Sequence, residues 1–143
     1  MVNMKTVLVL EDEPLVMNLL RYILKPYSLV EARSAEEALR LFRARGHEID
    51  LLLTDLSLPI ISGVQVALIL RCEIPTLPVI LTSGYPANGW NDRDAADLKR
   101  LGSKSVIVLQ KPNPPRQLLT AIDELIGAEQ PEKAVTARPS ADG

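Results

Sequence analysis

Polar residues suited to binding a metal ion and a phosphoryl group follow four apolar runs of the chain. The acidic stretch Glu11–Glu13 follows the first run, and Asp55 comes at the end of the second. The hydroxyl residues Thr82 and Ser83 end the third run, and Lys111 lies just beyond the fourth. Clustered carboxylates repel one another, and Mg²⁺, which prefers oxygen ligands, would relieve that repulsion.

This set of residues suits phosphoryl transfer, where catalysis is mainly positioning and charge neutralisation. Lys111 would pair with a phosphoryl oxygen, and a hydroxyl group would donate a hydrogen bond to it. The sequence contains no Walker loop and no glycine-rich dinucleotide motif, so a bound nucleotide is not expected. We therefore predict a carboxylate nucleophile, and Asp55 is the central candidate.

The apolar runs that carry these residues predict buried strands. They are continuous rather than alternating, which is typical of strands covered on both faces of a parallel sheet. A weaker run over 28–32 predicts an edge strand. The other predicted strands cover residues 7–10, 49–53, 79–81 and 106–109.

Helical patterns alternate with these strands, which indicates an α/β fold with a parallel sheet and right-handed crossovers. We expect a doubly wound sheet of five strands in the order 2-1-3-4-5, with helices on both faces. Ligands bind where the winding reverses, at the carboxyl ends of strands 1 and 3. The predicted helices begin near Pro14, Ser34, Gly63, Asn91 or Asp92, and Pro115. Ser34 with Glu37 three residues later is a capping-box pattern, and the fourth helix is expected to carry the apolar residues Ala95, Leu98 and Leu101.

The composition fits one α/β domain. The chain has 143 residues and a net charge of −2, so it lacks the basic footprint of a protein that binds nucleic acid or a membrane surface. Its single cysteine excludes an internal disulfide, and no run approaches the ~18 apolar residues of a transmembrane helix. We expect a soluble cytoplasmic domain over 1–127 and a disordered tail over 128–143.

Four stretches, VLVLEDEP, LLLTDLSLP, PVILTSG and LQKP, resemble the receiver domain of two-component response regulators. The resemblance covers residues 4–127, and each motif ends the strand that the family would place it on. The resemblance implies a CheY-like, flavodoxin-like fold. It also implies a single-domain response regulator that catalyses only its own phosphorylation and dephosphorylation and is not otherwise an enzyme. A sensor histidine kinase or a phosphotransfer protein would donate the phosphoryl group, and a downstream protein would receive the signal.

The resemblance gives Asp55 the role of phosphoacceptor. Glu11 and Asp12 match the acidic pair that holds Mg²⁺ together with Asp55, and the backbone carbonyl of Ser57 would complete the metal site. The family more often has Asp at the position of Glu11. Glu13 is expected beside the metal ligands rather than among them.

The resemblance also assigns the switch hydroxyl and the lysine. Ser83 matches the switch hydroxyl, because it lies five residues after Pro78 and precedes a small residue, with Thr82 as the competing candidate. Lys111 matches the lysine of the family, which would precede a cis bond to Pro112.

Other interpretations remain open at this point. The chain could be a pseudo-receiver that binds a partner without being phosphorylated. Glu11–Glu13 could instead be a helix N-terminal cluster favoured by the helix dipole. A dehalogenase-like phosphatase would also use an aspartate after a strand, but it needs a second aspartate where this chain has Ser57.

Two features predict how the signal leaves the site. The third helix is apolar almost all round, so part of its surface around Leu68 and Ile69 should be exposed and form a homodimer or a partner contact. Many receivers carry an aromatic ring three residues before the lysine, where this chain has Val108. We therefore expect activation to rely on the loop from Tyr85 to Trp90, in which Trp90 either packs the loop down or marks a contact.

Overall fold

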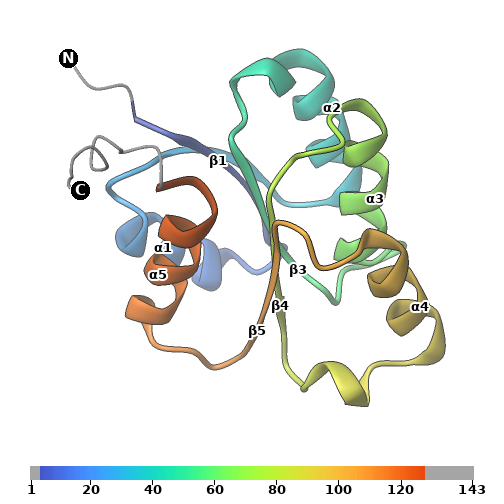
Figure 1. Ribbon diagram of the computed structural model, residues 1–143. Coiled ribbons are helices and arrows are strands. Elements are labelled where there is room, and N and C mark those ends of the chain that lie inside the picture. The colour runs from blue at the N-terminus through green and yellow to red at the C-terminus, as the bar shows by residue number, and fades with distance from the viewer. Residues whose placement is uncertain (1–3, 128–143) are drawn as a thin grey trace, which may run out of the picture.

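The protein is built on a parallel sheet of five strands in the order β2-β1-β3-β4-β5. The structure is a computed structural model that describes residues 4–127 (Figure 1), and the predicted tail over 128–143 lies outside the described residues. The order confirms the predicted fold, including the edge position of the second strand. The strands are β1 (Thr6–Leu10), β2 (Ser28–Ala32), β3 (Leu51–Asp55), β4 (Val79–Ser83) and β5 (Val106–Gln110).

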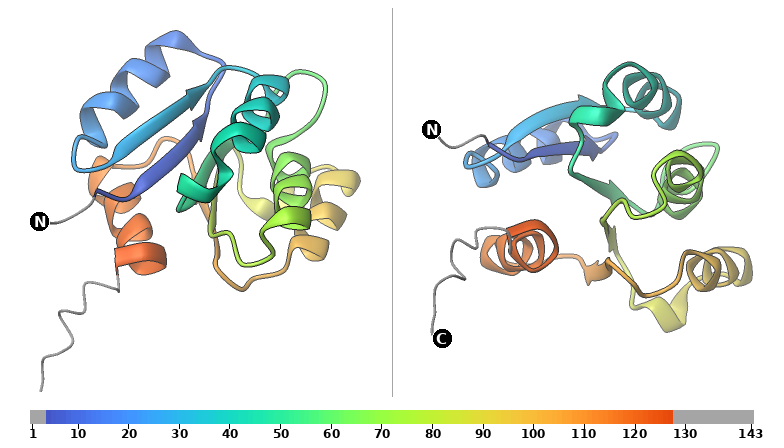
Figure 2. Two further views of the ribbon diagram at one scale, coloured as in Figure 1. Left: turned by 90° about the horizontal axis from the view of Figure 1, so that it is seen from above. Right: turned by 45° about the horizontal axis from the view of Figure 1, so that its top comes forward.

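Helices cover both faces of the sheet, as Figures 1 and 2 show. On one face lie α1 (Pro14–Ile23) and α5 (Pro115–Ile126). The other face is covered by α2 (Ala35–Arg45), α3 (Gly63–Glu73) and α4 (Asp92–Leu101). Among residues 4–127, no helix combines the length and the apolar character needed to cross a membrane.

The core forms two layers because successive strand side chains point to opposite faces of the sheet. In β1, Val7 and Val9 pack in the cluster that includes α1 and α5, whereas Leu8 and Leu10 pack in the cluster that includes α2, α3 and α4. All four side chains are buried. This two-sided burial explains why the strands read as continuous apolar runs.

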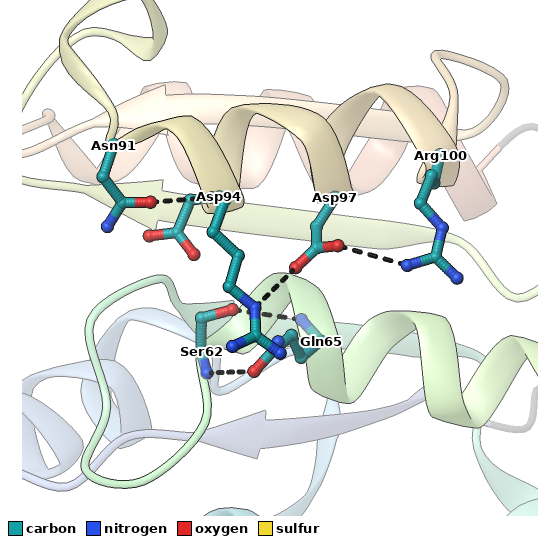
Figure 3. Close-up of polar contacts among 7 residues, drawn as sticks. Ser62, Gln65, Asn91, Asp94, Asp97 and Arg100 are labelled. Atoms are coloured by element: carbon teal, nitrogen blue, oxygen red, sulfur yellow. Dashed lines mark hydrogen bonds and ion pairs between the residues drawn. The ribbon is translucent and has the colours of Figure 1, made fainter.

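Side-chain caps fix where the helices begin. The Ser34 hydroxyl accepts a hydrogen bond from the Glu37 backbone N–H, as the capping-box pattern predicted. At the start of α3, Ser62 and Gln65 form a complete capping box (Figure 3). Asn91, not Asp92, caps α4 by accepting from the Asp94 N–H (Figure 3).

The inward face of α4 differs from the prediction. Ala95 is exposed, and the buried positions are Asp97 and Leu101, with Leu98 partly buried. The buried face of α4 is therefore rotated about the helix axis relative to the predicted one, and it includes the Asp97 carboxylate. This carboxylate is compensated by two arginines. Asp97 is paired with Arg100 at 3.3 Å (Figure 3), and its other carboxylate oxygen lies 4.0 Å from Arg93 Nε.

Candidate functional site

Asp55 and Lys111 meet at the carboxyl end of the sheet. Asp55 is the last residue of β3 and is 9% exposed, and Lys111 directly follows β5. The Lys111 ammonium nitrogen lies 3.2 Å from Asp55 Oδ1. The Lys111 backbone N–H donates to the carbonyl of Ser83 at 2.7 Å, and the peptide bond to Pro112 is cis, as predicted. The sheet order therefore brings together two residues 56 positions apart in the sequence.

Two further carboxylates lie beside Asp55. One carboxylate oxygen from each of Glu11, Asp12 and Asp55 lies within 4.8 Å of the other two. Glu11 is buried and Asp12 is half-buried, whereas Glu13 is exposed. The Glu13 backbone N–H donates to Glu11 Oε2 at 3.1 Å, so Glu13 orients Glu11 through its main chain.

The environment of Glu11 opposes its negative charge. Burial raises the pKa of the Glu11 carboxyl above its ordinary value, and the carboxylates of Asp55 and Asp12 raise it further. The Glu13 N–H and the Lys111 ammonium act in the opposite direction without cancelling that rise. Three oxygen donors around a site that disfavours net negative charge fit Mg²⁺, which takes carboxylate ligands and keeps waters in the remaining positions.

A glycine lets the β3–α3 loop close over Asp55. A Cβ atom on Gly63 would lie 2.1 Å from the Asp55 carbonyl oxygen and 2.8 Å from Thr54 Oγ1, distances that real side chains do not occupy. The Gly63 N–H donates to the Leu56 carbonyl at 2.9 Å, and the Thr54 hydroxyl donates to the Asp55 carbonyl at 3.0 Å. The start of α3 is thus anchored to the end of β3 and holds Asp55 in place. Ser57, in the same loop, is exposed.

The two candidate hydroxyls face different surroundings. Thr82 pairs with Asp55 in the strand register and lines a cavity of about 250 Å³ together with Glu11, Asp55 and Lys111. Ser83 is 1% exposed, and its hydroxyl contacts the loop that follows β4. The structure thus places Ser83 next to the site, with its hydroxyl bonded elsewhere.

Trp90 contacts this site, and sequence reasoning left its role undecided. Its ring is buried against the core in a loop whose other residues, 84–89, are all exposed. Its indole N–H donates to Ser83 Oγ at 3.1 Å. A lone tryptophan among Pro, Gly and Asn residues fits either a packed loop or a contact surface, and nothing in the sequence names the atom that its N–H binds.

Comparisons of the sequence with known proteins identify response regulators as relatives of this chain. A sequence profile of the response regulator receiver domain matches residues 7–123. The polar-differentiation response regulator DivK of Brucella ovis is 37% identical over 93 residues, which cover 62% of this chain and 74% of DivK.

Solved structures agree with this match. A response regulator receiver domain protein from Clostridium thermocellum has a TM-score of 0.73 and 26% identity, over 87% of this chain and 96% of that one. The signal receiver domain of an HD domain-containing protein from Pseudomonas fluorescens Pf-5 has a TM-score of 0.76 and 25% identity, over 90% of this chain and 98% of that one. The chain therefore belongs to the response regulator receiver domain family.

Proposed function

We propose that this receiver domain works as a phosphorylation-controlled switch that accepts a phosphoryl group on Asp55. The donor is a histidine kinase or a phosphotransfer protein, and the output is a changed contact with a downstream protein. The observation that carries the proposal is the Lys111 ammonium 3.2 Å from Asp55 Oδ1, beside the three-carboxylate cluster. The phosphoryl group of the donor comes originally from ATP. We therefore place the reaction in the cytoplasm.

The proposed reaction moves one phosphoryl group. A carboxylate oxygen of Asp55 forms a bond to phosphorus while the phosphorus–nitrogen bond of the donor phosphohistidine breaks. The imidazole leaves with the electron pair of that bond, and it ends as a neutral ring because its other nitrogen is protonated in the donor. Lys111, whose ammonium lies 3.2 Å from Asp55 Oδ1, would pair with an oxygen of the transferred group.

In this proposal the carboxylates of Glu11, Asp12 and Asp55 and the backbone carbonyl of Ser57 would hold Mg²⁺. The ion, when bound, would neutralise charge on the phosphoryl oxygens. The chain supplies the remaining stabilisation through Lys111, and through Ser83 once its hydroxyl turns toward the phosphoryl group.

The proposal is tested by incubating the full chain with acetyl phosphate, with and without Mg²⁺, and following its intact mass. We expect the mass of one phosphoryl group to be added only when Mg²⁺ is present. A chain that gains no phosphoryl group under either condition would instead support a pseudo-receiver.

Replacing Glu11 by Gln should stabilise the metal-free protein and weaken its response to Mg²⁺. The substitution removes one buried charge from the cluster, so the melting temperature in a chelator should rise by roughly 2–6 °C, the shift for about 1 kcal/mol in a domain of this size. Mg²⁺ should raise the melting temperature of the wild type by binding its folded state, and this increase should be smaller in Glu11→Gln. Thermal unfolding with and without Mg²⁺ measures both quantities.

Glu13→Gln is the matched control, because the Glu13 side chain is exposed and lies outside the cluster. It should leave both melting temperatures close to those of the wild type. Equal Mg²⁺ responses in Glu11→Gln and the wild type would remove Glu11 from the metal site.

We also propose that α3 carries a contact surface, either for a second copy of this chain or for the target. Ile69 is 44% exposed, and it lines a groove between α3 and α4 with Leu68, Gln65 and Asp97. Leu68 itself is half-buried and packs against the core. The exposed apolar area is therefore smaller than the sequence predicted and is centred on Ile69.

Ile69→Glu should lower self-association if α3 forms a homodimer. A charge at this position would be desolvated in the interface, which we expect to cost at least about tenfold in the dimer dissociation constant. Sedimentation velocity over a range of concentrations measures it. Leu15→Glu, an 81% exposed leucine on α1, is the control and should not change the distribution. A wild type that stays monomeric at high concentration would exclude the homodimer.

A further inference from the structure

The loop after β4 folds back so that Trp90 lies on Ser83. Residues 84–89 are exposed and include a short 3-10 turn over Ala87–Gly89, after which Trp90 is 7% exposed. The Trp90 backbone N–H donates to the Ala87 carbonyl at 3.2 Å, which closes the turn. The ring then packs in the core cluster that also contains Leu81 and Leu101. The loop is therefore anchored to the core by one side chain next to β4.

The Ser83 hydroxyl has its hydrogen-bonding capacity filled. It donates to the Tyr85 carbonyl at 2.8 Å and accepts from the Tyr85 N–H at 3.1 Å and from the Trp90 indole N–H at 3.1 Å. A serine hydroxyl has one donor and two acceptor positions, and all three are used. The hydroxyl can donate to a phosphoryl oxygen only after it gives up the Tyr85 carbonyl.

Trp90 resists that movement for a chemical reason. The indole N–H is the only hydrogen-bond donor of the side chain, and it is buried with the ring. If Ser83 Oγ moves away, the indole keeps only the longer contact of 3.4 Å to the Tyr85 carbonyl. A buried donor that loses its acceptor is costly, so the state in which Ser83 faces Trp90 is favoured.

We propose that Trp90 is a positioning residue that acts through Ser83 and sets how readily the Ser83 hydroxyl turns toward phosphorylated Asp55. This inference rests on the proposed function of Asp55 as phosphoacceptor. Within the described residues, Trp90 is the aromatic side chain that hydrogen-bonds to Ser83, and position 108, three residues before the lysine, holds a half-buried valine. The loop therefore takes the place of a ring on β5.

Trp90→Phe tests the inference because it keeps an aromatic ring and removes the N–H. The rate at which acetyl phosphate and Mg²⁺ add a phosphoryl group should rise about fivefold, the factor that corresponds to one net hydrogen bond. In a Ser83→Ala background the same change should have no effect, because the contact is already gone. In a Thr82→Val background the fivefold rise should persist.

A second measurement does not depend on how well Trp90→Phe folds. The chain has one tryptophan, so its fluorescence, excited where tyrosine does not absorb, reports on Trp90 alone. Ser83→Ala should shift the emission of the unphosphorylated protein, because the indole loses its main acceptor, and Thr82→Val should leave the emission unchanged.

The outcomes separate the two claims. If the wild type gains a phosphoryl group and Trp90→Phe gains it at the same rate, this inference alone is overturned. It is also overturned if Trp90→Phe changes the phosphorylation rate by the same factor in the wild type and in the Ser83→Ala background. Unchanged emission in Ser83→Ala would also overturn it. A wild type that gains no phosphoryl group would overturn the proposed function, and the inference with it.

Discussion

Asp55→Asn should abolish the Mg²⁺-dependent gain of a phosphoryl group while leaving the fold intact. An amide has nearly the shape of a carboxylate but is not a nucleophile, so the rate with acetyl phosphate should fall at least about a thousandfold. The fold should survive because the change removes one of three neighbouring carboxylates, and Lys111, which loses its partner, is half-exposed. Intact mass and thermal unfolding measure the two effects.

Asp50→Asn provides a matched control just before the same strand. Asp50 directly precedes β3, at the opposite end from Asp55, and its Oδ2 accepts from the Thr6 N–H at 2.8 Å. This substitution should leave the phosphorylation rate unchanged. If Asp55→Asn took up phosphoryl groups at the wild-type rate, another residue would have to be the acceptor.

Gly63→Ala should cause the largest loss of stability of any single methyl group added near the site. The new Cβ would lie 2.1 Å from the carbonyl oxygen of Asp55 and 3.0 Å from its carbonyl carbon, so backbone atoms must move. We expect the free energy of unfolding to fall by about 3 kcal/mol, the upper end for overpacking, because backbone cannot rotate away as a side chain can. Chemical denaturation measures this loss.

Gly84→Ala is the control for Gly63→Ala. A Cβ on Gly84 would meet nothing within 4 Å, and the residue does not need a positive φ angle. The free energy of unfolding should therefore change by less than about 0.5 kcal/mol. A Gly63→Ala protein as stable as Gly84→Ala would show that the approach of α3 to Asp55 is looser than the structure has it.

The sheet and the meeting of Asp55 with Lys111 could be predicted from the sequence because both follow from topology. Continuous apolar runs identify strands buried on two faces, and alternation with helices orders them in parallel. Once the order is known, the residue at the end of β3 and the residue after β5 must lie at the same edge. The strand order thus predicts that Asp55 and Lys111 are neighbours. Only the distance of 3.2 Å between Lys111 Nζ and Asp55 Oδ1 had to come from the structure.

The face of α4 was predicted only in part, because helix rotation is set by packing and charge together: Leu98 and Leu101 do pack inward, and Ala95 does not. Ala95 fits an apolar stripe, but the structure turns it outward and buries Asp97. Arg93 and Arg100 stand one turn before and one turn after Asp97 and compensate its charge. A hydrophobic pattern alone cannot predict that a carboxylate faces the core.

The contact between Trp90 and Ser83 could not be predicted because it depends on the path of an irregular loop. The two residues are seven positions apart in sequence, and the 3-10 turn that brings them together has no strong sequence signal. The exposure of α3 was overestimated for a related reason. Leu68 is partly covered by its neighbours in the core, so Ile69 is the exposed large apolar residue of that helix.

The most direct test of the account is to locate the phosphoryl group on the chain. The wild-type protein is treated with acetyl phosphate and Mg²⁺, reduced with borohydride, which converts an aspartyl phosphate to homoserine, and digested for peptide mass mapping. The account predicts homoserine at position 55 and unmodified residues at Glu11 and Asp12. Homoserine at Asp12 or at any other aspartate, with Asp55 intact, would contradict it.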